Sequence, residues 1–167
     1  MEGSHKRRAK SQQEKAPMKK LKPIKFKHRF DPELYRCRDG RKLPKRLYEN
    51  ARLLHAAVLR VWCELGQPDL YLNSTWRHEA YNKREGGGKR SLHLKCMAAD
   101  LDFRGVEPPV VFRTVKKLQD NGTITMGGAG LYDHFCHLDV RGTRARWLAG
   151  KAKRAAIRRR KKRLTKK

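Results

Sequence analysis

A regular apolar stripe runs through the region from residue 44 to residue 66. Its apolar residues recur at steps of three and four, the spacing of one face of an α-helix; they are Leu47, Ala51, Leu54, Val58, Val61 and Leu65. Pro44 suits the first turn of a helix, and Gly66 followed by Pro68 suits its end. The pattern therefore predicts a helix over residues 44–66.

Shorter stretches predict the remaining elements. Residues 108–122 begin with a proline pair and carry a second apolar stripe, so they predict another helix, and residues 78–85 predict a short one. Alternating or small apolar stretches predict three strands, over residues 69–77, 96–103 and 135–140. Because helices and strands mix without a regular strand–helix–strand repeat, the predicted fold class is α+β. The glycine-rich stretch between the last helix and the last strand predicts a turn.

The charge distribution divides the chain into three parts. Residues 1–30 carry a net charge of +9 and residues 141–167 a net charge of +14, whereas residues 31–140 carry only +4. The N-terminal stretch has no hydrophobic period, and the C-terminal one ends in almost pure charge. We therefore predict a basic N-terminal arm over 1–30, one folded domain over 31–147 and a basic C-terminal arm over 148–167, with both arms disordered.

Composition also limits the cellular compartment and the binding partners that we expect for the protein. No apolar run reaches the length of a membrane span, and the basic N-terminus lacks the apolar stretch of a secretory signal. The four cysteines lie at wide spacings, which argues against a disulfide framework or a paired-cysteine zinc site and favours reduced thiols in a protein made in a cytoplasm. The arms predict binding to a polyanion, such as nucleic acid, anionic lipid or an anionic wall polymer, through counterion release.

Two segments carry side chains that suit a metal ion. His93 and Asp100 lie in "SLHLKCMAAD", and His137 lies in "YDHFCHLDV". Imidazole nitrogen and carboxylate oxygen are zinc ligands, and a catalytic zinc keeps three protein ligands with one open position. If the strands predicted over 96–103 and 135–140 are neighbours, the three side chains converge. The spacing alone is a weak signal, because a turn-capping aspartate and a hydrogen-bonded histidine at the edge of the core would give the same letters.

Three segments in the same order resemble the zinc D-Ala-D-Ala carboxypeptidase family, the M15 peptidases. "SLHLKCMAAD" is similar to the family motif S-x-H-x-x-G-x-A-x-D, "GGAGLYDHFCHLDVRGTRARW" resembles the closing segment, and "STWRHEAYN" resembles the arginine segment. The resemblance covers residues 36–147 and neither arm. It implies a small domain of the D-Ala-D-Ala carboxypeptidase/hedgehog-like type, with helices packed on an antiparallel sheet.

The resemblance also implies roles for individual side chains. His93, Asp100 and His137 match the ligands of a zinc ion. Arg77 matches the arginine that holds a carbonyl or carboxylate of the substrate, a task suited to a planar fork of donors. Ser91 matches a serine that helps to bind the substrate. His78, next to this arginine, is interpreted as a surface or helix histidine.

The general base of the family is a carboxylate a few residues before the last ligand. Asp133 lies four residues before His137, and His134 occupies the more usual place three residues before it. We predict Asp133 as the base and His134 as a stabiliser of the oxyanion, with a turn-forming role as the alternative for Asp133. Asp139 is expected to orient a ligand or to hold Arg141.

Two cysteines depart from the family pattern. Cys96 replaces the glycine of the H-x-x-G motif, so it would be strained if that position requires a positive φ. A thiol near the metal is one interpretation of Cys96, and a free thiol in a tight core is the one we favour. Cys136 replaces the usual valine before the last histidine and is expected to face the core.

The implied function is that of a zinc-dependent peptidase. It would hydrolyse peptides of bacterial cell walls (peptidoglycan), as a carboxypeptidase or an endopeptidase, in the manner of a phage lysin. Such a protein would be made in the cytoplasm of an infected host or carried in a virion, and would act at the wall. The alternative is a catalytically degraded peptidase-fold protein that binds nucleic acid through its basic arms in a virion or ribonucleoprotein particle. Retention of all three ligands favours the enzyme, whereas the charge and Cys96 favour the binding protein.

Overall fold

A five-stranded sheet forms the centre of the molecule. The computed structural model describes residues 22–24, 26–151, 153–156 and 158. The strands lie in the order β1-β2-β4-β3-β5, and their bounds are Leu70–Ser74 (β1), Ala98–Phe103 (β2), Gly128–Leu131 (β3), Cys136–Asp139 (β4) and Ala145–Leu148 (β5). The predicted α+β class is therefore confirmed.

The sheet is mixed. This corrects the wholly antiparallel sheet that the family resemblance implies. The pairs β1–β2, β2–β4 and β3–β4 are antiparallel, whereas β3 and β5 are parallel. After β4 the chain turns at Gly142, whose φ is +84°, and crosses to the free edge of β3. It then runs opposite to β4, and therefore in the same direction as β3.

Two long helices pack together beside the sheet. The helix α1 (Tyr48–Glu64) follows a 3-10 turn at Lys45–Leu47, and α3 (Pro108–Asp120) begins at the predicted proline pair. A proline costs no hydrogen bond there, because the first N–H groups of a helix have no partner within it. The predicted stripe of α1 is buried or half-buried, α1 packs on α3, and α3 packs on β3 and β4. The apolar core thus lies between these helices and the sheet.

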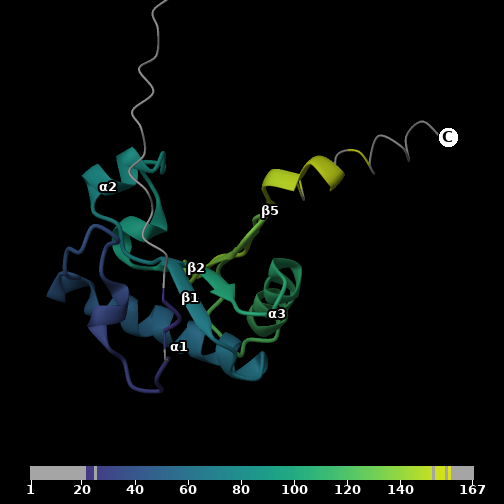
Figure 1. Cartoon of the computed structure of the whole chain (residues 1–167), viewed down its shortest axis with the longest axis horizontal. Helices are drawn as coiled ribbons and strands as arrows, with labels where there is room; N and C mark the ends of the chain where they lie inside the picture. Colours follow the sequence, from purple (N-terminus) through teal and green to yellow (C-terminus); the bar gives the residue numbers. More distant parts are fainter. Residues whose placement is uncertain (1–21, 25, 152, 157, 159–167) are drawn as a thin grey trace, which may run out of the picture.

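The segments that precede β2 form a separate part of the structure. The short helix α2 (Glu79–Arg84) is followed by the glycine run at 86–88 and by the 3-10 turn η3 (Leu92–Lys95). η3 contacts both α2 and β2. Figure 1 shows α2 well away from α3. This part of the chain carries Ser91 and His93, two of the candidate site residues, towards the sheet.

Two strands were not predicted from the sequence. β3 lies in the glycine-rich stretch that predicted a turn, and β5 contains Trp147. Glycines are poor strand formers, but here they permit close approach. A Cβ at Gly128 would overlap the carboxylate of Asp139, and one at Gly130 would overlap the Trp147 ring. Packing therefore overrides the local propensity of β3.

Two residues that precede position 31, where the predicted domain starts, contact the rest of the fold. Ile24 forms a β-bridge with Leu70, and Phe26 is buried and stacks on His55 with ring centroids 4.7 Å apart. Residues 1–21, most of the predicted N-terminal arm, and residues 159–167, slightly less than half of the predicted C-terminal arm, lie outside the described residues, so their predicted disorder stays a prediction. None of the helices within the described ranges has the length and apolar character needed to cross a membrane.

Candidate metal centre

Neighbouring strands bring the three predicted ligands together. Asp100 on β2 and His137 on β4 are direct partners in the antiparallel register, so their side chains leave the same face of the sheet. His93 comes from η3, which contacts β2. One donor atom from each of the three residues lies within 4.8 Å of the other two, and all three are buried. The structure thus brings together the side chains that the sequence selected.

Neighbouring acceptors orient both histidines. Nδ1 of His93 donates to the carbonyl oxygen of Thr75 at 2.6 Å, which leaves Nε2 towards Asp100 Oδ1 at 3.4 Å. Nε2 of His137 lies 3.3 Å from Asp139 Oδ2, and its Nδ1 lies 2.9 Å from Asp100 Oδ1. Each imidazole therefore offers one nitrogen to the cluster while an acceptor holds the other, as metal-binding histidines usually do.

Asp100 is the negative centre of this cluster. Its Oδ1 faces both histidines, and its Oδ2 accepts a hydrogen bond from Arg77 Nη2 at 3.0 Å. Burial raises the pKa of Asp100, but hydrogen bonds from His137 and His93 outweigh burial and hold this pKa well below its ordinary value. For His137, burial lowers the pKa, and the hydrogen bonds to Asp100 and Asp139 raise it above the ordinary value. Asp100 is therefore ionised and ready to bind a cation.

Asp139 orients His137 and holds Arg141, as expected from the sequence. It is fully buried, and its carboxylate accepts from Arg141 Nε at 2.8 Å, from Arg141 Nη2 at 2.6 Å and from the Gly128 N–H at 2.8 Å. Burial raises the pKa of Asp139, but its hydrogen bonds to His137 and Arg141 keep this pKa far below the ordinary value. The Asp139 carboxylate thus places a negative charge next to Nε2 of His137.

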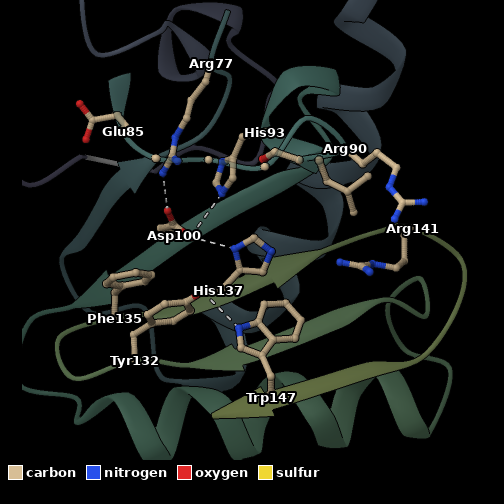
Figure 2. Close-up of a pocket in the computed structure, with 15 residues that line it drawn as sticks. Arg77, Glu85, Arg90, His93, Asp100, Tyr132, Phe135, His137, Arg141 and Trp147 are labelled. Atoms are coloured by element: carbon tan, nitrogen blue, oxygen red, sulfur yellow. Dashed lines mark hydrogen bonds and ion pairs between the residues drawn. The ribbon is translucent and has the colours of Figure 1, made fainter. Parts of the chain in front are cut away.

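The cluster lies in a pocket of about 640 Å³. Figure 2 shows Arg77 reaching Asp100, with His93 and His137 beside it. The pocket is lined by Arg77, Glu85, Gly86, Gly87, Gly88, Arg90, Ser91, Leu92, His93, Asp100, Tyr132, Phe135, His137, Arg141 and Trp147. Arg77 and Ser91 therefore lie at the site, and the glycine run at 86–88 forms part of its lining.

An aromatic wall closes one side of the pocket. Tyr132 and Phe135 stack with ring centroids 4.4 Å apart, and Trp147 Nε1 donates to the Tyr132 hydroxyl at 3.2 Å. The Trp147 ring lies 5.1 Å from that of His137. Sequence reasoning missed this wall because Trp147 lies on β5, a strand that it did not predict.

Neither the predicted base, Asp133, nor the predicted oxyanion stabiliser, His134, lines the pocket. The loop between β3 and β4 is closed by a hydrogen bond from the Tyr132 N–H to the Phe135 carbonyl at 3.1 Å, and Asp133 and His134 are exposed within it. Asp133 Oδ1 accepts from the Lys151 N–H at 2.7 Å, at the start of the helical residues that follow β5. In this structure Asp133 therefore caps the helical turn that follows β5, a structural role that differs from the turn-forming one considered as its alternative.

Both unusual cysteines are core thiols. Cys96 has φ +53° and ψ +36°, so the position does require the left-handed conformation that glycine adopts most easily. Its side chain is fully buried and is not part of the metal cluster, which confirms the interpretation as a free core thiol. Cys136 is also fully buried, within the apolar core.

The thiols are expected to differ sharply in reactivity. Burial raises the pKa of Cys96 to about 12 and that of Cys136 still further, and Cys37 is also buried, whereas Cys63 is exposed. Because the thiolate is the reactive form, brief alkylation of the native protein should modify Cys63 alone, as read by peptide mass spectrometry. Alkylation after denaturation should modify all four. Modification of Cys96 as fast as Cys63 would contradict its burial.

The comparison with known families agrees with the site. The family model for peptidase M15 matches residues 33–139, which is more than half of the chain and includes all three clustered ligands. The chain therefore belongs to the peptidase M15 family. A search of curated proteins returns no match.

Proposed function

We propose that the protein is a zinc-dependent peptidase that hydrolyses peptide bonds in bacterial cell-wall peptides, in the manner of a lysin. The observation that supports this proposal most strongly is the buried cluster of His93, Asp100 and His137 at the base of an open pocket. Two nitrogens and one carboxylate oxygen are a donor set that zinc accepts, with a fourth position left for water or substrate. A zinc ion bound there would act as a Lewis acid and make water a nucleophile near neutral pH.

The surrounding side chains suit a substrate with carboxylate groups. Arg77, Arg90 and Arg141 all line the pocket, and a guanidinium binds carboxylates through paired hydrogen bonds. Arg77 is already fixed by Asp100 and by Ser74 Oγ, at 3.0 and 2.7 Å, so it is oriented before substrate arrives. Ser91 also lines the pocket. These residues would hold the peptide while the aromatic wall excludes water.

The pocket lining contains few side chains that could transfer a proton during hydrolysis. Glu85 lines the pocket, but Figure 2 shows its carboxylate turned away from Asp100. Asp133 remains our proposed base, and His134 our proposed oxyanion stabiliser. For this role Asp133 would have to release the Lys151 N–H and move towards the pocket.

Asparagine at position 133 separates the two roles of Asp133. If Asp133 is the base, Asp133→Asn should lower kcat by about 10²- to 10⁴-fold with zinc content unchanged. If Asp133 is only a cap, the same change should leave both kcat and stability nearly intact, because the asparagine Oδ1 can also accept from the Lys151 N–H, whereas Asp133→Ala should cost about 0.5–2 kcal/mol of stability. Steady-state kinetics and thermal unfolding of the same preparation measure both quantities. An unchanged kcat would remove Asp133 from the mechanism.

The hydrolysis itself is tested with purified wall peptides. The protein should release shorter peptides, identified by mass, and a chelator or His93→Ala should stop their release. The masses of the products also show whether the cut is terminal or internal. A folded, zinc-loaded protein that releases no product from any wall peptide would contradict the proposal.

One observation favours a second candidate function. Because the proposed base is engaged as a cap, the chain also fits a catalytically degraded peptidase-fold protein that binds nucleic acid through its basic arms, in a virion or ribonucleoprotein particle. For both candidates, we propose that the arms bind a polyanion, either nucleic acid or the cell envelope. The high positive charge of the chain supports this part of the proposal.

Shortening the C-terminal arm tests the polyanion proposal. Removing residues 159–167 deletes basic residues but spares β5 and the turn that Asp133 caps. The shortened chain should bind DNA more weakly and with a smaller dependence on salt concentration, since fewer counterions are released. Hydrolysis of a small soluble peptide should not change. Equal salt dependence in gel-retardation titrations of both chains would contradict the role of the arm.

A further inference from the structure

A second cluster of metal-binding side chains lies outside the pocket. Cys37, Asp39 and His78 each offer a donor atom, and these atoms lie within 4.8 Å of one another. None of the three lines the pocket, and none is a member of the His93–Asp100–His137 cluster. The Cys37 side chain is buried, while Asp39 and His78 are partly exposed, so an ion could reach the cluster from solvent.

The cluster joins two segments that are far apart in the sequence. Cys37 and Asp39 lie in a tight turn, in which the Cys37 N–H donates to the Arg41 carbonyl at 3.0 Å and the Gly40 N–H donates to the Cys37 carbonyl at 2.9 Å. His78 lies directly before α2, and its Nε2 is 2.6 Å from Asp39 Oδ2. The turn is held by its own backbone, so two ligands are fixed before any ion binds.

The Cys37 sulfur is available to an ion, because no disulfide uses it and it lies buried beside Asp39 and His78. Burial raises the pKa of this thiol, so the ion-free protein holds it protonated. A bound cation would favour the thiolate, which is the form in which cysteine binds metals.

We propose that Cys37, Asp39 and His78 form a second zinc site, which clips the turn at residues 37–41 to the start of α2. Sulfur, nitrogen and carboxylate oxygen are all zinc ligands, whereas magnesium and calcium avoid sulfur. One thiolate and one carboxylate balance the two charges of the ion, and the thiol proton leaves to solvent on binding. The Arg41 Nε that lies 3.6 Å from Asp39 Oδ2 is on an exposed side chain and forms only a weak ion pair that an ion would displace.

An ion bound by Cys37, Asp39 and His78 would also affect the pocket. His78 is the neighbour of Arg77, whose guanidinium holds Asp100 and lines the pocket. Fixing His78 would therefore restrict the backbone that carries Arg77. The proposal does not depend on peptide hydrolysis, because the two clusters share no ligand.

Cobalt titration distinguishes this site from the other one. A cobalt(II) ion bound to a thiolate shows a charge-transfer band in the near ultraviolet, and His93, Asp100 and His137 offer no sulfur. Titrating the full chain with cobalt should produce this band, and added zinc should remove it. His93→Ala should keep the band, and so should Cys63→Ser, which removes the exposed cysteine.

Substitutions at the cluster itself decide the result. Cys37→Ser should abolish the band, and Asp39→Asn and His78→Gln should each weaken apparent cobalt affinity by at least ~10-fold. If Cys37→Ser does not fold, the two milder variants still carry the test. The proposal is overturned if the folded full chain gives no thiolate band, if the band survives in Cys37→Ser, or if both milder variants bind cobalt as tightly as the unchanged chain.

Discussion

Replacing Asp100 with asparagine is expected to abolish zinc binding at the pocket and, with it, hydrolysis of wall peptides. The change keeps the shape of the side chain but removes the one negative charge among the three ligands. It also leaves His137 and Arg77 facing a neutral amide in a buried place. The loss of zinc affinity should exceed the roughly 10- to 100-fold cost of removing an outer partner of a metal ligand.

The measurement combines metal analysis with kinetics. After exhaustive dialysis, Asp100→Asn should carry one zinc ion per chain fewer than the unchanged protein and should release no product peptides. Asp102→Asn is the matched control, because it makes the same chemical change on the same strand at a residue that does not line the pocket. Zinc content equal in the two variants would show that Asp100 does not bind the ion.

Replacing Gly127 with alanine is expected to have the largest effect on folding. A Cβ at this position would overlap the backbone carbonyl oxygen of Asp139, next to the end of β4. A strand carbonyl cannot rotate away as a flexible side chain can, so β3 and β4 must separate. We expect a loss at or above the upper end of the roughly 1–3 kcal/mol typical of overpacking.

Denaturant unfolding of matched variants measures this effect. Gly88→Ala makes the same change at a glycine with no neighbouring atom in the way and no positive φ, so it should change the free energy of unfolding by only a few tenths of a kcal/mol. If Gly127→Ala were as stable as Gly88→Ala, the close contact between Gly127 and the Asp139 carbonyl at the end of β4 would be wrong.

The predictions from the sequence succeeded where a pattern repeats over many residues. The stripe of α1 and the proline pair of α3 specify these helices locally, and β1, β2 and β4 carry the apolar character of buried strands. β3 and β5 escaped prediction because they are held by each other and by close packing. The glycines of β3 have low strand propensity of their own, and the Trp147 ring packs over Gly130, a contact between segments that a local pattern does not show.

In the candidate site, too, residues within short sequence motifs could be predicted, whereas a role that depends on residues far apart in the sequence could not. His93, Asp100 and His137 could be selected because their spacing fits the M15 pattern, and their convergence follows from β2 and β4 being neighbours. The role of Asp133 could not be read in the same way, because its partner Lys151 lies beyond β5.

The cluster of Cys37, Asp39 and His78 gave no signal in the sequence. Its ligands come from two segments whose meeting depends on the tertiary fold, and no paired-cysteine spacing marks it. The sequence shows only that Cys37 and Asp39 lie shortly before Gly40 and that His78 lies directly before α2, and neither feature alone indicates a metal site.

The most direct test of the central claim is an anomalous difference map from crystals of the protein grown with zinc and measured at the zinc absorption edge. We predict a peak at bonding distance, roughly 2.0–2.2 Å, from His93 Nε2, His137 Nδ1 and a carboxylate oxygen of Asp100. A map with no peak between these three side chains, at full zinc occupancy elsewhere in the crystal, would contradict the assignment of this cluster as a metal centre.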